Sequence, residues 1–122
     1  MDLTQEPTHW QLSVSGDLEY RECSSFRMNI DHILRSDPRP AVVDLSGLDG
    51  IDSSGLGLLV GMSHDHAAAG RRLVLVTNGA IESLLCDSRL DGVFSTAPTL
   101  EQAVESLTGG PTLAPGPDVY AA

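Results

Sequence analysis

Two adjacent serines, Ser53 and Ser54, carry small hydroxyl groups that could act as nucleophiles or as acceptors of a transferred group. They follow Asp52 in the stretch DLSGLDGIDSSGLGLLVGM (residues 44–62), between an apolar strand-like run and an apolar helix-like run. A serine at such a junction can attack a substrate or accept a group from another protein. A nucleophile elbow reads Gly-x-Ser-x-Gly, and neither serine fits it, because Ser54 is followed directly by Gly55. The pattern therefore argues against a serine hydrolase.

The nearest histidines, His64 and His66, supply neither a base nor a metal site. They lie several turns along the same predicted helix, so they cannot reach back to its first turn. Neighbours one or two residues apart on a helix point in different directions, which predicts that His64, Asp65 and His66 form a solvated polar face. GLGLLVG (residues 55–61) departs from the dinucleotide-binding glycine spacing, and the chain has no P-loop lysine. We expect no metal or cofactor.

Asp52 and the two serines also admit a purely structural interpretation. Asp and Ser are the best helix N-caps, because their side-chain oxygens accept otherwise unpaired amide protons. The spacing alone fits a simple cap equally well. One cap residue suffices, however, and a second hydroxyl adds little stability. An exposed serine at a helix N-terminus suits phosphorylation, since the backbone amides and the dipole there favour negative charge.

Hydrophobic periodicity predicts the elements that position these residues. Strand patterns alternate with helix patterns, and short connections rich in Gly, Pro and Asp separate them. The order predicts an α/β domain whose helices cross over a largely parallel sheet. The expected strands cover residues 9–16, 41–46, 71–78 and 92–98, and the expected helices cover residues 21–36, 55–70, 79–90 and 99–110.

Length and composition limit the possible functions. The chain has 122 residues, a common size for one domain, and its last stretch, GGPTLAPGPDVYAA (residues 109–122), is predicted to be a disordered tail. Its net charge is −10 and it has no lysine, which disfavours direct nucleic-acid binding. Cys23 and Cys86 are predicted to be free, mostly buried thiols. Without a signal-peptide pattern or a membrane-span pattern, the protein is expected to be cytoplasmic, with no membrane partner.

Several segments together resemble the STAS domain, and specifically the stand-alone anti-sigma factor antagonists of bacteria. The core of the resemblance is VVDLSGLDGIDSSGLGLLVG (residues 42–61). The segments LSVSGDLEY, AAAGRRLVLVTN and IESLLCDSRLDGVFSTAPTLEQAV extend it over most of the chain. The resemblance implies a single STAS-like domain over residues 1–108, with a mixed, largely parallel β-sheet packed against about four α-helices.

The resemblance also implies a function that requires no chemistry from this chain. In that family, the unphosphorylated antagonist binds an anti-sigma factor serine kinase of the histidine-kinase-like ATPase fold, and a sigma factor is released. The kinase phosphorylates the first hydroxyl after the motif aspartate, which here is Ser53, and a PP2C-type phosphatase reverses the modification. The protein would then be no enzyme, because ATP, magnesium and the catalytic base come from its partner. Some STAS domains instead serve without a phosphoswitch as scaffolds, or in lipid transport or larger signalling particles.

The expected partner surface surrounds Ser53. The chain departs from the family pattern in having Glu19 where Asp is usual, and HDHAAAG (residues 64–70) where the helix is often basic. Asp44 is expected to lie near this surface and to help shape it, although a carboxylate bonded to loop amides is an equally good interpretation. The predicted partner-binding residues are Asp17, Glu19, Asp44, Asp52, Ser53, Ser54, Gly55, Leu56 and Gly57.

Overall fold

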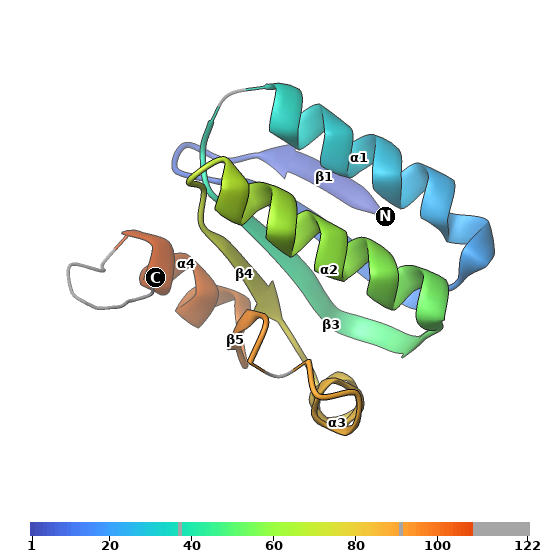
Figure 1. Ribbon diagram of the computed structural model, residues 1–122. Coiled ribbons are helices and arrows are strands. Elements are labelled where there is room, and N and C mark those ends of the chain that lie inside the picture. Colours follow the sequence, from blue (N-terminus) through green and yellow to red (C-terminus); the bar gives the residue numbers. More distant parts are fainter. Residues whose placement is uncertain (37, 91, 109–122) are drawn as a thin grey trace.

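A five-stranded sheet with helices on both faces forms the domain, as a computed structural model of the chain shows (Figure 1). The structure describes residues 1–36, 38–90 and 92–108. The strand order is β1-β2-β3-β4-β5; β1 is antiparallel to β2, and the other neighbours are parallel. The strands are β1 (Asp2–Gln5), β2 (Trp10–Leu18), β3 (Ala41–Ile51), β4 (Leu73–Val76) and β5 (Ser95–Ala97). The helices are the 3₁₀ turn η1 (Tyr20–Glu22), α1 (Cys23–Arg35), α2 (Ser53–Ala68), α3 (Gly79–Asp87) and α4 (Leu100–Thr108).

The α/β alternation predicted from periodicity is confirmed, but the first strand was missed. The segment DLTQ is short and polar, and only Leu3 packs against the core. β1 exists because it pairs with the edge of β2, with Leu3 opposite Leu12, and a backbone pairing of this kind leaves no hydrophobic period to find. The third strand is also longer than predicted, since β3 continues to Ile51 and ends one residue before Asp52.

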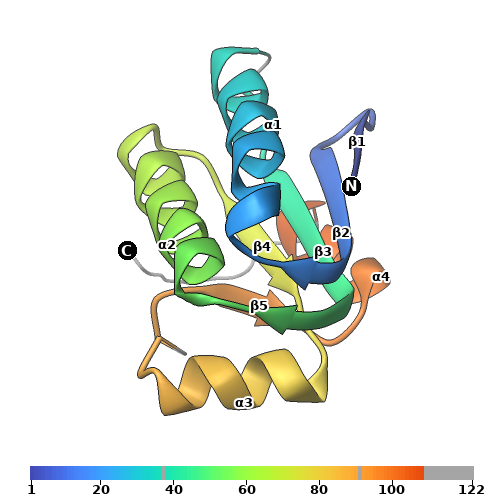
Figure 2. The same cartoon turned by 90° about the vertical axis from the view of Figure 1, so that its right-hand side faces the viewer.

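The helices form a layer on each face of the sheet (Figure 2). α1 and α2 pack side by side on one face, and α4 covers the other. Consecutive residues of β3 and β4 therefore point to different helices, and both are buried. On the α1–α2 side, Val43 and Leu75 join Phe26 and Leu59 in the main core. On the α4 side, a second cluster contains Val42, Val74, Val76, Ala97 and Ala103.

The two cysteines are free, as predicted, but the prediction of burial is wrong. Cys86 is exposed and Cys23 is only half-buried. Cys86 follows Leu85, the buried residue of the last turn of α3, and so falls on the outer face of that helix. None of the described helices is long and apolar enough to cross a membrane. The predicted disordered tail, residues 109–122, lies outside the described residues.

Candidate functional site

Asp52 organises the first turn of α2. It is the N-cap residue, and its Oδ1 accepts a hydrogen bond of 3.0 Å from the Gly55 amide. Its Oδ2 accepts one of 3.0 Å from the Tyr20 amide, in the turn that follows β2. The Asp52 amide in turn donates to the Leu18 carbonyl, at 3.2 Å. A single side chain thus caps the helix and ties it to the β2–η1 connection.

Because Asp52 performs the capping, the serine hydroxyls are left for other uses. Ser53 is exposed and Ser54 is half-buried. Neither hydroxyl makes a hydrogen bond within residues 1–36, 38–90 and 92–108. The amides of Ser53 and Ser54 also lack an acceptor in this part of the chain, as expected for the first turn of a helix. The site presents a free hydroxyl beside unpaired helix N–H groups.

Gly55 allows α2 to approach the sheet closely enough to hold this arrangement. Its position is buried, and a Cβ there would lie 2.6 Å from the Leu18 carbonyl oxygen and 2.7 Å from Ile51 Cγ1. No side chain larger than hydrogen fits without moving the backbone. The next residue, Leu56, is half-buried against the core, whereas Gly57 is exposed with open space around it.

The predicted residues of the β2 end lie beside this turn. Asp17 is exposed and lies opposite Gly50 in the sheet. A Cβ added at Gly50 would lie 2.9 Å from the Asp17 carboxylate. Glu19 is exposed and forms a capping box with Glu22, whose carboxylate accepts from the Glu19 amide at 3.2 Å. The sequence analysis missed Tyr20, which is 78% exposed and whose amide binds Asp52. The Glu-x-x-Glu spacing was the available signal for this turn.

Asp44 lies apart from this group of residues. It sits within β3, not at its end, and its Oδ1 accepts hydrogen bonds from the amide (3.0 Å) and the hydroxyl (2.6 Å) of Ser46. The β2–β3 register shifts at this point, between the pairs Ser13–Asp44 and Ser15–Gly47. Asp44 thus binds a backbone amide at a β-bulge, which is the alternative interpretation offered by the sequence.

The prediction that His66 belongs to a solvated face is wrong. His64 and Asp65 are exposed, but His66 is fully buried on the inward face of α2, one turn after Met62. Its Nδ1 donates to the Met62 carbonyl at 2.9 Å, and its Nε2 is buried without a hydrogen-bond partner in the described residues. Burial, partly opposed by the bond to the Met62 carbonyl, lowers the pKa of the imidazole. At about 1.5 Å of rise per residue, His66 is roughly 20 Å along α2 from Ser53.

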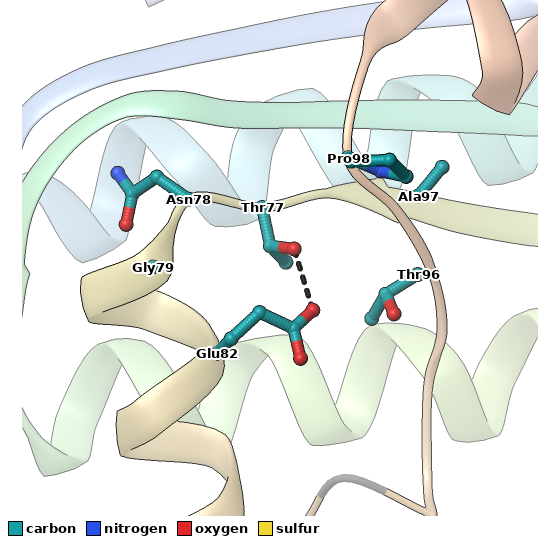
Figure 3. A pocket seen from close by; sticks show the side chains of 7 residues that line it. All are labelled: Thr77, Asn78, Gly79, Glu82, Thr96, Ala97 and Pro98. Carbon is teal, nitrogen blue, oxygen red and sulfur yellow. Dashed lines mark hydrogen bonds between the residues drawn. The ribbon is translucent and has the colours of Figure 1, made fainter.

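Two hollows in the described part of the chain have no contribution from Ser53 to their lining. The cavity in Figure 3, of about 370 Å³, lies at the carboxyl ends of β4 and β5. Within it the buried Thr77 hydroxyl donates to the Glu82 carboxylate at 2.6 Å. A second hollow of about 940 Å³ lies beside the carboxyl-terminal part of α2 and is lined by Arg71, Arg72 and Phe94 among others. No group of three metal-ligating side chains occurs among the described residues. The Ser53 site is an open surface.

Comparison with known proteins places this chain in a family. Residues 1–108 match the family model described as "Mlab, STAS domain". A protein described as "a putative anti-sigma factor antagonist" from Thermotoga maritima is similar in structure, with a TM-score of 0.79, 21% identity, and coverage of 87% of this chain and 92% of that one. An anti-sigma factor antagonist from Mycobacterium paratuberculosis has a TM-score of 0.78 and 23% identity, with coverage of 86% of this chain and 90% of that one. The anti-sigma factor antagonist SpoIIAA in its unphosphorylated form has a TM-score of 0.69 and 16% identity, with coverage of 89% of this chain and 97% of that one. The predicted fold is thereby confirmed.

Proposed function

Because the chain belongs to the STAS domain family, we propose that it acts as an anti-sigma factor antagonist. Its unphosphorylated form binds an anti-sigma factor serine kinase with a histidine-kinase-like ATPase fold and so releases a sigma factor. Phosphorylation of Ser53 ends this binding, and a PP2C-type phosphatase restores it. The observation that carries the proposal is the division of labour at α2, where Asp52 caps the helix and leaves the Ser53 hydroxyl exposed.

The absence of a base favours a phosphate acceptor over an enzyme. Activation of a serine as a nucleophile requires a general base within hydrogen-bond reach. Within the described part of the chain, the Ser53 hydroxyl has no hydrogen-bond partner, and the nearest carboxylate in sequence, Asp52, is engaged by two amides. A kinase can supply the base, the nucleotide and the metal ion to a hydroxyl on an open surface. This chain contributes the substrate and the docking surface.

The geometry of α2 also accommodates the product. A phosphoryl group on Ser53 would lie at the positive end of the helix dipole, beside the unpaired amides of Ser53 and Ser54. The neighbouring Asp52 carboxylate opposes it, but Ser53 is exposed and Asp52 is only half-buried, so water screens the repulsion. We therefore expect the phosphorylated protein to keep its fold.

Labelling with and without a kinase tests the proposal. The kinase is first captured from a lysate of the source cells with Ser53→Ala as bait, since this variant cannot be switched off. The wild-type protein is then incubated with ATP alone and with ATP plus the kinase, and intact mass and fragment spectra are recorded. We expect one phosphoryl group, on Ser53, only when the kinase is present.

Each other outcome would overturn a specific part of the proposal. Phosphate that appears with ATP alone would make the protein an enzyme that uses Ser53 itself. Full kinase binding without labelling would make it a scaffold without a phosphoswitch. If Ser53→Ala still accepts phosphate while Ser54→Ala does not, the acceptor is Ser54.

A further inference from the structure

Among the described residues, the second half of β3 has a strand on only one of its edges. β3 pairs with β4 only from Ala41 to Asp44, although it continues along β2 as far as Ile51. The register with β2 shifts twice along this extension, so the ladder on the remaining edge is itself irregular. This extension leads directly into Asp52 and Ser53, and its stability affects the position of the acceptor.

The side chain of Asn78 takes the place of the missing neighbour. Its Nδ2 donates to the carbonyl of Ser46 at 3.1 Å and to the carbonyl of Leu48 at 2.9 Å. Its Oδ1 accepts from the Ile81 amide at 2.9 Å and so caps α3. This network fixes the orientation of the amide, because the reverse orientation would place its oxygen against two carbonyls. Although Asn78 borders the cavity in Figure 3, its amide points away from that cavity.

We infer that Asn78 is a positioning residue for Ser53. From the start of α3, Asn78 holds the β3 extension in place. The inference rests on the proposed function for its biological meaning, but the restraint itself belongs to the free protein. Small displacements of the extension are consequential, because α2 and the end of β2 approach so closely that even a Cβ added at Gly55 would lie 2.6 Å from the Leu18 carbonyl oxygen. A loosened extension moves the first turn of α2 relative to the Tyr20 turn, to which Asp52 ties it.

Two substitutions separate the restraint from the helix cap. Asn78→Asp keeps a good N-cap but removes the Nδ2 donor, and Asn78→Ser keeps a cap with a side chain too short to reach β3. Thr99→Ala serves as the control for lost stability, because the Thr99 hydroxyl caps α4 on the far face by accepting from the Gln102 amide. The three variants are compared with wild type by thermal melts, by hydrogen exchange of the free protein and by phosphorylation kinetics with the captured kinase.

Hydrogen exchange gives the direct test. In both Asn78 variants we expect amides of residues 48–52 to exchange about tenfold faster relative to the amides of β4, as the loss of one or two hydrogen bonds predicts. We expect kcat/KM for Ser53 phosphorylation to fall by a similar factor. Thr99→Ala should lower the melting temperature without either local effect. Unchanged exchange at residues 48–52 in both variants would overturn the inference whether or not any kinase acts.

The kinetic result separates the two proposals. Faster exchange with wild-type phosphorylation kinetics would show that the restraint has no bearing on Ser53, which would overturn the positioning role. The Asn78 variants could also show faster exchange while no kinase phosphorylates the wild-type protein. That result would confirm the restraint and contradict the proposed function.

Discussion

A negative charge at Ser53 should weaken kinase binding by at least about 30-fold without unfolding the protein. The informative variants are Ser53→Asp, which adds a permanent charge at the first residue of α2, and Ser53→Ala, which removes the hydroxyl. In the free protein the added charge gains about 0.3–1 kcal/mol from the helix N-terminus. It loses on the order of 1 kcal/mol to the half-buried Asp52 carboxylate next to it, taking the dielectric constant of water between the two side chains. The two effects nearly cancel, so the melting temperature should change by only a few degrees.

In the complex the same charge has no compensation. The acceptor must approach the γ-phosphate of ATP, so a carboxylate or a phosphoryl group on Ser53 faces like charge and loses its water. An uncompensated charge buried in an interface costs about 2–5 kcal/mol. At about 1.4 kcal/mol per tenfold, this weakens binding by roughly 30-fold to a few thousand-fold. Ser53→Ala, which adds no charge, should bind about as well as wild type.

Titration calorimetry with the kinase and ATP, alongside thermal melts, checks both halves of this reasoning. Ser83→Asp is the control, because it adds the same charge at an exposed serine of α3, outside the predicted partner-binding residues. If Ser53→Asp binds as tightly as wild type, or loses affinity only because it unfolds, the electrostatic explanation is wrong.

Three further predictions concern the fold that presents Ser53. Gly55→Ala should destabilise the protein by about 1–3 kcal/mol in urea unfolding, because the added Cβ would lie 2.6 Å from the Leu18 carbonyl oxygen. Gly57→Ala is the control: its Cβ meets open space, so it should stabilise the protein by up to about 1 kcal/mol. Asp52→Ala should lower the unfolding free energy by about 1–2 kcal/mol, because the helix cap at the Gly55 amide is lost. The bond from the Tyr20 amide to Asp52 is lost as well, so proteolysis of the Tyr20 turn should be faster. Because the pKa of His66 is lowered in the folded state, stability should be full above the unfolded value near 6.5 and decline below it, by at most about 1.4 kcal/mol per pH unit. Urea midpoints between pH 7.5 and 5 should show this decline in wild type and lose its His66 part in His66→Met.

Local patterns predicted what depends on local physics. The Asp52 cap follows from side-chain oxygens and unpaired amides within one turn, and the buried β3 strand follows from a run of β-branched and apolar residues. Two of the failures share a different cause. β1 is defined by its pairing with β2, and the Tyr20–Asp52 bond joins residues far apart in sequence, so neither leaves a local pattern.

His66 was predicted to be exposed because histidine is polar, but its position along the helix determines that it is buried. Its spacing from Leu59 and Met62 places it on the inward face of α2, so the helical period was the better guide than side-chain polarity. Asn78 gives the opposite lesson, because its place before α3 indicates only a cap. Its two bonds to β3 depend on where β4 stops beside a longer strand, which sequence periodicity does not show.

Release of the sigma factor is the most direct test of the proposed function. A fluorescently labelled sigma factor is bound to the captured kinase, and its anisotropy is followed as the antagonist is added in its unphosphorylated or Ser53-phosphorylated form. The proposal predicts that the unphosphorylated protein displaces the sigma factor, and that the phosphorylated protein requires at least about 30-fold higher concentration to do so. Displacement by both forms at the same concentration, or by neither, would contradict it.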